Sequence, residues 1–140
     1  MEHLIHFELV DYRVFASRGL KFDRIVSCEM IEAVGHHHLG SFFEAVDRLL
    51  RTDGIFVMQA ITMPDSRYEA YKHSVDFINT VIFPGGHCPS LTALMKAMAA
   101  RSSMHVDQVS NYGLHYAETL RRWRWRFNSS LRQVYGLRFD

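Results

Sequence analysis

The chain has 140 residues, of which 48% are hydrophobic and 22% are charged, and its formal net charge is +1. This length suffices for one domain with a buried core. The nearly neutral charge excludes a global electrostatic argument for nucleic-acid binding. The two cysteines, Cys28 and Cys88, form no CxxC pattern and no cysteine–histidine ligand spacing. We therefore expect a reduced, cytoplasmic protein.

The first half of the chain predicts a strand–helix–strand unit. The short apolar run inside Phe22–Cys28 is typical of a buried parallel strand. Leu39–Leu50 has apolar residues at the spacing of an amphipathic helix, and Ile55–Ile61 follows as a second buried strand. Strands joined in this way are expected to be parallel, with a right-handed crossover. A further short strand is expected at Leu4–Val10.

The second half is predicted to be mainly helical. Arg67–Ile82 carries apolar residues on one face, and the turn Phe83–Gly86 ends this helix because proline cannot continue it. Another helix is expected over Leu91–Ala100, with the preceding serine as its cap. Alternation over Met104–Val109 favours one more strand, and Tyr116–Tyr135 again has helical spacing. The expected buried stripe of that last helix consists of Leu120, Trp123, Phe127, Leu131 and Val134.

Several polar residues stand out, and each has a purely structural alternative. Gln59 is an amide inside an apolar strand, where it needs hydrogen-bond partners. By pattern alone, Glu32 is a surface or capping acid, and Tyr116 is a core aromatic with a satisfied hydroxyl. The run His36–His38 suggests zinc, but consecutive side chains point in different directions and no ligand cluster completes a tetrahedral set. We expect no metal site.

The basic and aromatic stretch Arg121–Phe127 (RRWRWRF) suggests contact with nucleic acid or anionic lipid. Helical geometry instead places Trp123 and Phe127 on the core face and spreads the arginines over the exposed side. A solvated helix face is therefore favoured, and we expect no nucleic-acid partner. Trp125 lies off the apolar stripe, where it is free to touch lipid headgroups.

Four segments of the chain match one known family in order and with similar spacing. The chain resembles the cyclopropane-fatty-acyl-phospholipid synthases and the mycolic acid cyclopropane synthases. The most specific motifs are EMIEAVGH, IFPGG and HYAETLRRW. The matching segments, which span nearly the whole chain, are Phe22–Gly35, Gly54–Ile61, Val75–Ser90 and Gly113–Phe127.

The resemblance implies an enzyme that uses S-adenosylmethionine and a bound bicarbonate. In that family the alkene of an unsaturated phospholipid acyl chain attacks the sulfonium methyl group, and a carbocation forms. Bicarbonate removes a proton as the cyclopropane ring closes. This is general-base catalysis beside a cation in a site that excludes water.

Four candidate catalytic residues follow from the resemblance. Glu32 matches the carboxylate that holds bicarbonate, and Tyr116 matches the tyrosine whose hydroxyl contacts the same ion. Gln59 occupies the place of a histidine or glutamine ligand. Ile61 occupies the place of a residue that contributes a backbone group.

Two further residues are candidates for binding the cofactor. Asp11 matches a family position near the adenine of S-adenosylmethionine. Cys28 lies at the carboxyl end of its predicted strand, where open α/β sheets bind ligands. The family also uses a cysteine of its glycine-rich first loop as a bicarbonate ligand, and neither Cys28 nor Cys88 aligns with it.

The resemblance also predicts which parts of the family's fold this chain contains. The expected fold is α/β, a partial Rossmann-like class I methyltransferase domain over residues 1–140. It comprises strands 3, 4, 5 and 6 of the family's sheet with a helical insertion. Residues 1–10 contain neither the glycine-rich cofactor turn nor the acidic residue that holds the ribose, and strands 1, 2 and 7 have no counterpart. Only strands 4 and 5 would then be neighbours, and bare edges invite association.

The resulting prediction is methylene or methyl transfer to the double bond of unsaturated phospholipid acyl chains. By itself the chain is expected to be inactive, to bind S-adenosylmethionine poorly and to lie peripherally at a membrane. Its expected partners are acyl chains, a complementary N-terminal half or a second copy of itself. Two alternatives stay open. One is a non-catalytic remnant or partner-binding half-domain, and the other is a related carbon methyltransferase with another substrate.

Overall fold

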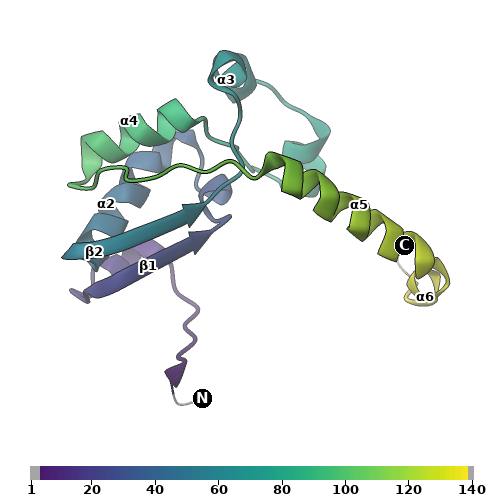
Figure 1. Ribbon diagram of the computed structural model, residues 1–140, viewed down its shortest axis with the longest axis horizontal. Helices are drawn as coiled ribbons and strands as arrows, with labels where there is room; N and C mark the ends of the chain where they lie inside the picture. The colour runs from purple at the N-terminus through teal and green to yellow at the C-terminus, as the bar shows by residue number, and fades with distance from the viewer. Residues whose placement is uncertain (1–3, 139–140) are drawn as a thin grey trace. The chain divides into compact units, whose positions relative to one another are not determined.

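The computed structural model describes residues 4–138, which fall into two compact units, one ending at His105 and the other beginning at Val106. The first unit contains a two-stranded sheet with helices, and the second contains helices (Figure 1). The chain is thus α/β, as the sequence predicts. The expectation of one domain over residues 1–140 stays a prediction.

The predicted strand–helix–strand unit is confirmed. Strand β1 spans Phe22–Cys28, helix α2 spans Leu39–Leu49 and strand β2 spans Leu50–Gln59. The strands pair in parallel, with Cys28 opposite Gln59 at their carboxyl ends. β2 begins earlier than predicted because its first residues continue directly from α2.

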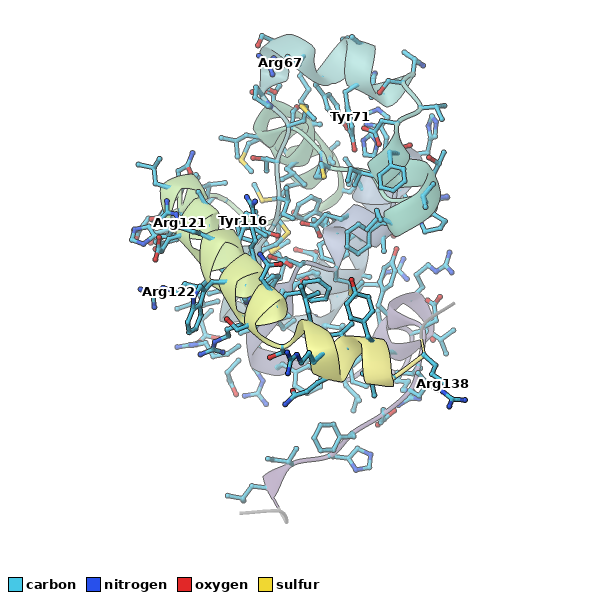
Figure 2. The ribbon with its side chains drawn as sticks, turned by 90° about the vertical axis from the view of Figure 1, so that its right-hand side faces the viewer. Arg67, Tyr71, Tyr116, Arg121, Arg122 and Arg138 are labelled. Atoms are coloured by element: carbon cyan, nitrogen blue, oxygen red, sulfur yellow. The ribbon has the colours of Figure 1, made fainter. Side chains whose placement is uncertain are left out.

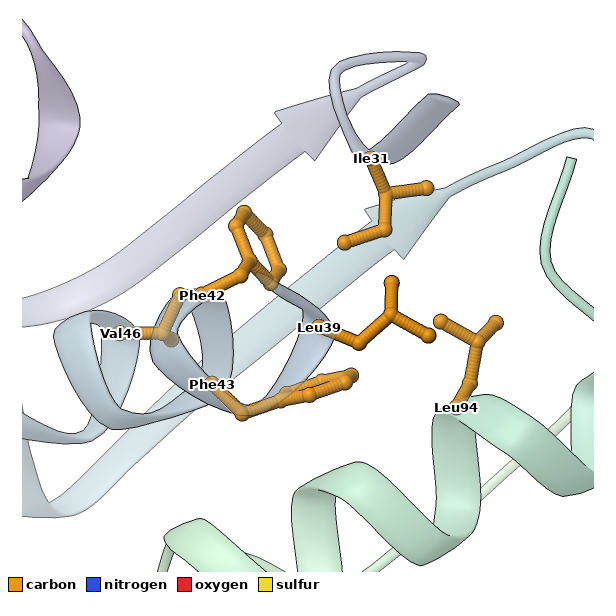
Figure 3. Packing of buried hydrophobic residues seen from close by; sticks show 6 residues of the cluster. All are labelled: Ile31, Leu39, Phe42, Phe43, Val46 and Leu94. Carbon is orange, nitrogen blue, oxygen red and sulfur yellow. The ribbon is translucent and has the colours of Figure 1, made fainter. Parts of the chain in front are cut away.

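A small hydrophobic core holds this unit together. In Figure 3, Leu94 of α4 (Leu91–Arg101) points toward Leu39 and Phe43 of α2. Ser90 caps α4 as predicted, since its Oγ accepts a hydrogen bond from the Ala93 N–H at 3.2 Å. The buried residues of the main cluster are Ile31, Leu39, Phe42, Phe43, Val46 and Leu94.

The expected continuous helix over Arg67–Ile82 is wrong. Helix α3 ends at Lys72, and a short π-helical segment, η4, follows at Ile78–Ile82. Between them the side chains of Asp76 and Asn79 each accept a hydrogen bond from the other's backbone N–H, at 2.8 and 2.9 Å. Such local bonds compete with the helical ladder. The other elements of this unit are α1 (Tyr12–Ala16), η2 (Ile31–Ala33), η3 (His36–His38) and α3 (Asp65–Lys72).

The strands expected at Leu4–Val10 and Met104–Val109 are also wrong. Both segments are irregular, and most of their apolar side chains are exposed. A strand forms only where a neighbour satisfies its backbone donors and acceptors. Among residues 4–138, β1 and β2 are the only paired strands.

The second unit contains two helices, α5 (Gly113–Ser129) and α6 (Leu131–Gly136). The predicted helical tail is therefore confirmed in type but interrupted at Ser130. Its predicted buried stripe is wrong, because Leu120, Trp123 and Phe127 are exposed and neither helix buries a residue.

None of the helices described between residues 4 and 138 combines the length and the apolar character needed to cross a membrane.

Candidate functional site

The carboxyl ends of the two strands form the centre of the candidate site. The Glu29 N–H donates to the Gln59 carbonyl at 2.9 Å, and Gln59 Nε2 donates to Glu29 Oε1 at 2.8 Å. The second bond involves the side-chain amide that the sequence singled out, and this side chain is exposed, so its partners include solvent. Glu29 has a φ of 50°, in the left-handed region that non-glycine residues rarely adopt. The chain therefore turns sharply after β1 and enters η2.

Glu32 lies in η2 and reaches across to the segment after β2. Its Oε1 accepts a hydrogen bond from the Ile61 N–H at 2.5 Å, and its backbone carbonyl accepts one from the His87 N–H at 2.8 Å. Its other carboxylate oxygen, Oε2, is buried and has no hydrogen-bond partner among the described residues. The predicted convergence of Glu32 and Ile61, with Gln59 two residues before Ile61, is thus confirmed. Their catalytic roles stay predictions.

Tyr116 belongs to α5 in the second unit, where Figure 2 shows it on the same helix as Arg121 and Arg122. Its side chain is exposed and so is not a core aromatic, and its backbone N–H donates to the Tyr112 carbonyl at 3.1 Å. Its approach to Glu32 stays a prediction.

The two candidate cofactor residues have different surroundings. Cys28 is an exposed free thiol at the end of β1, as predicted from the strand. Asp11 caps α1 by accepting the Arg13 N–H at 2.8 Å, and it also pairs with the Arg13 guanidinium at 2.7 Å. Hydrogen bonds from the Arg13 side chain hold the pKa of Asp11 well below its usual range. This capping is a local structural role, and a contact with adenine stays a prediction.

A second polar cluster, which sequence reasoning missed, lies beside the Glu32 turn. The hydroxyl of the buried Tyr68 lies 2.7 Å from His36 Nδ1 and 2.8 Å from His87 Nε2. Burial, as the main cause, raises the pKa of Tyr68 to about 12 and lowers the pKa of both histidines. The sequence shows the histidine run and a later tyrosine-bearing helix, but His36, Tyr68 and His87 become neighbours only in the folded chain.

The triple-histidine segment His36–His38 forms η3. No group of three or more His, Cys, Asp or Glu side chains within the described part of the chain could hold a metal ion. His36 instead takes part in the hydrogen-bonded cluster with Tyr68.

The parallel strands and the polar residues at their carboxyl ends define part of a class I methyltransferase fold. A family model described as mycolic acid cyclopropane synthetase matches residues 1–139. The chain therefore belongs to the mycolic acid cyclopropane synthetase family.

Individual relatives agree with this assignment. The chain is 38% identical over 138 residues to the tuberculostearic acid methyltransferase UfaA1 of Mycobacterium tuberculosis, covering 99% of this chain and 32% of that protein. It is 35% identical over 120 residues to the cyclopropane-fatty-acyl-phospholipid synthase of Escherichia coli, covering 85% of this chain and 29% of that protein. The solved mycolic acid cyclopropane synthase CmaA1, complexed with SAH and CTAB, matches with a TM-score of 0.73 and 29% identity, covering 85% of this chain and 45% of that one. The chain thus spans about a third of the length of these two curated relatives.

Proposed function

We propose that this chain supplies part of the active site of an S-adenosylmethionine-dependent enzyme that transfers a methyl or methylene group to the double bond of an unsaturated phospholipid acyl chain. The observation that carries the proposal is the carboxylate of Glu32. One oxygen is fixed by the Ile61 N–H, while the other is buried at the carboxyl end of a parallel sheet and has no hydrogen-bond partner within residues 4–138. Open α/β sheets bind their ligands at this end.

The unpaired oxygen of Glu32 fits the bicarbonate that the resemblance implies. Buried polar atoms are normally paired, so an orphaned carboxylate oxygen favours a ligand that carries a hydrogen-bond donor. The hydroxyl of bicarbonate is such a donor, and Glu32 is the described residue positioned to accept it. When bound, bicarbonate supplies a general base for proton removal. The Ile61 N–H fixes the orientation of Glu32, and Gln59, whose side-chain amide donates to Glu29, precedes Ile61 by two residues. Tyr116, on α5 of the second unit, stays a candidate bicarbonate contact by resemblance alone.

S-adenosylmethionine, when bound, supplies the electrophilic methyl group. Cys28 is exposed at the sheet end, where the cofactor is expected, and Asp11 is the second candidate contact. The chain contains no glycine-rich turn of the family's type. Taken alone it should therefore bind S-adenosylmethionine weakly. Calorimetric affinity in the micromolar range, about −8 kcal/mol, would contradict this expectation.

The lipid substrate is proposed from the relatives, whose names span a methylated fatty acid, a phospholipid-derived cyclopropane and a cyclopropanated mycolic acid. All of these names imply carbon transfer to a long acyl chain. The proposed partner is a phospholipid acyl chain, reached by peripheral association with a membrane. A related carbon methyltransferase, with a methyl branch as its product, remains within the same proposal.

A second candidate function is that of a partner-binding half-domain without activity of its own. This alternative is favoured by the uncovered sheet, since Val26 of β1 is 75% exposed and Val57 of β2 is 55% exposed. A two-stranded sheet with bare edges is marginal by itself and prone to pairing. The proposed partner is a complementary half that carries the cofactor turn and the neighbouring strands, or a second copy of this chain.

One experiment separates these functions. The chain is co-expressed with the N-terminal half of a complete relative, and phospholipid fatty acids are analysed by mass spectrometry for addition of one CH₂ unit. Methylated or cyclopropanated lipid that appears with both halves and disappears with Glu32→Gln supports the enzyme. Glu44→Gln on the exposed face of α2 is the matched control and should leave the product unchanged. A stable complex without any lipid product would favour the partner-binding half-domain.

A further inference from the structure

A pocket of about 490 Å³ lies in the first unit, next to the turn that carries Glu32. It is formed by the start of η3, the end of α3, the loop after α3, part of η4 and the glycine turn before His87. Its volume is within the usual range for small-ligand sites. The basic and titratable nitrogen groups that line it are His36, His37, Lys72, His73 and His87, and no aspartate or glutamate of the described chain lines it.

The Tyr68 hydroxyl fixes two of these imidazoles. A hydroxyl has one hydrogen, so Tyr68 can donate to only one of the two histidine nitrogens that it faces. The other histidine must then donate its own N–H to the tyrosine oxygen. Each ring is bound through one nitrogen, Nδ1 of His36 and Nε2 of His87, at 2.7 and 2.8 Å. The opposite nitrogen of each ring makes no hydrogen bond within residues 4–138 and is available to a ligand.

Lys72 is the lysine that lines the pocket, and its ion-pair partner Glu69 is not among the lining residues. After burial, the cation of Lys72 is the next cause that lowers the pKa of His36, and His36 and Lys72 together act in the same direction on His87. An anion in the pocket would reverse these repulsions and favour the protonated rings. Glu69 pairs with Lys72 at 2.9 Å, but its side chain is 81% exposed, so this pair is weak and can be replaced.

The pocket adjoins the turn that carries Glu32. The His87 backbone N–H donates to the Glu32 carbonyl at 2.8 Å, and His36 follows the Glu32 turn directly along the chain. A ligand held by His36 and His87 would therefore lie beside the segment that positions Glu32. Many lining residues, including His37 and His73, are exposed, which suits a hydrated charged group better than an acyl chain.

We propose that this pocket binds the phosphate of the phospholipid substrate, with Lys72 and the free nitrogens of His36 and His87 as its donors. The choice of a lipid rests on the proposed function above, whereas the affinity for phosphate does not. Charge-assisted hydrogen bonds from lysine and imidazolium are the usual means of holding phosphate oxygens. Because the histidines titrate, binding strengthens as the pH falls. The titratable or charged groups around the pocket are Glu32, His36, His37, Tyr68, Glu69, Tyr71, Lys72, His73, Asp76, His87 and Cys88.

The test uses the whole chain and inorganic phosphate, with imidazole resonances followed by NMR. We expect phosphate to shift the resonances of His36 and His87, to raise their pKa values, and to bind with about millimolar affinity near pH 6. Binding should weaken several-fold toward about pH 8 as the rings lose their protons. Lys72→Met should weaken binding about tenfold, the effect of one charge-assisted hydrogen bond.

Two variants keep the result interpretable. Lys96→Met removes an exposed lysine of α4 that does not line the pocket, and it should leave phosphate binding unchanged. Tyr68→Phe removes the hydroxyl that orients both rings. It should weaken phosphate binding and leave the NMR resonances of the other helices unchanged. Absence of binding near pH 6, or equal losses in Lys72→Met and Lys96→Met, overturns the proposal.

A lipid arm identifies the source of the phosphate. Short-chain phosphatidylglycerol, used below its micelle concentration, should bind at least as tightly as inorganic phosphate and shift the same two histidines. Tighter binding of inorganic phosphate would overturn assignment to the lipid headgroup. These measurements need neither S-adenosylmethionine nor methyl transfer. Failure of phosphate binding therefore leaves the lipid-transfer proposal standing, and failure of transfer leaves the phosphate site standing.

Discussion

The two oxygens of the Glu32 carboxylate differ in their surroundings, and two substitutions can separate their contributions to stability. Glu32→Gln keeps an acceptor for the Ile61 N–H but removes the charge from the buried, unpaired oxygen. An unsatisfied buried polar group costs about 1–3 kcal/mol, and a charged one costs more. Glutamine still leaves an unpaired group there, so only the charged part of the cost is recovered. We expect Glu32→Gln to raise the free energy of unfolding by about 1 kcal/mol.

Glu32→Ala should act in the opposite direction. It removes the unpaired oxygen, which recovers about 1 kcal/mol, but it also removes the acceptor of the Ile61 N–H, and hydrogen bonds to charged groups contribute about 1.5–3 kcal/mol. Ile61 is partly exposed, so water can replace part of the lost bond. We expect a loss of about 1 kcal/mol, which places the two variants roughly 2 kcal/mol apart.

Urea unfolding followed by circular dichroism measures both changes. Glu44→Gln, which removes an exposed ion pair with Arg48, should change stability by less than about 0.5 kcal/mol. If Glu32→Gln destabilises the chain as much as Glu32→Ala does, the second oxygen of Glu32 is not a charged, unpaired group. A destabilised glutamine variant would mean that the second oxygen is satisfied in solution, and Glu32 would then have no need of a ligand that donates a hydrogen bond.

Three further outcomes are expected. Leu94→Ala should lower the free energy of unfolding by about 2–5 kcal/mol in urea titrations, whereas Leu114→Ala on exposed α5 should change it by less than about 0.5 kcal/mol. Folding lowers the pKa of His36 and His87, so the unfolded chain takes up more protons than the folded chain when the pH falls. Thermal stability should therefore be full above the usual histidine pKa of about 6.5 and should decrease as the pH drops below it. Asp11→Ala should lower the unfolding free energy by about 1 kcal/mol through loss of the α1 cap, even without cofactor.

Each of these outcomes has a contrary result. Equal effects of the two leucine substitutions would show that Leu94 is not part of a cooperative core. A melting temperature that rises as the pH is lowered from about 7 to about 5 would contradict the lowered histidine pKa values. If the Asp11 variant loses no stability, the cap does not stabilise α1, and the adenine contact becomes the main candidate role of Asp11.

The sequence predicted the parts of the fold that depend on local pattern and one adjacent partner. The bounds of β1 and the parallel pairing followed from a buried apolar run, a helical period and a second run. The pairing of Glu32 with Ile61 was anticipated through the family resemblance. The Tyr68 bridge was not, because a hydroxyl between two imidazoles depends on segments that only the tertiary fold brings together. The break after Lys72 was missed because the mutual bonds of Asp76 and Asn79 replace helical ones.

The wrong predictions of buried side chains have one physical cause. Leu4–Val10 has the composition of a strand, and α5 has the period of an amphipathic helix, but the apolar side chains of both are largely exposed. The outward face of β1, including Val26, is exposed as well. Local pattern specifies which face is apolar, whereas burial requires a second surface. One complement that supplies neighbouring strands to the first unit would cover Leu4–Val10 and the outward face of β1 together. Amide exchange in Leu4–Val10 and at Val26 should therefore slow together on addition of the complementary half, and slowing in only one of them would mean that the two faces have unrelated partners.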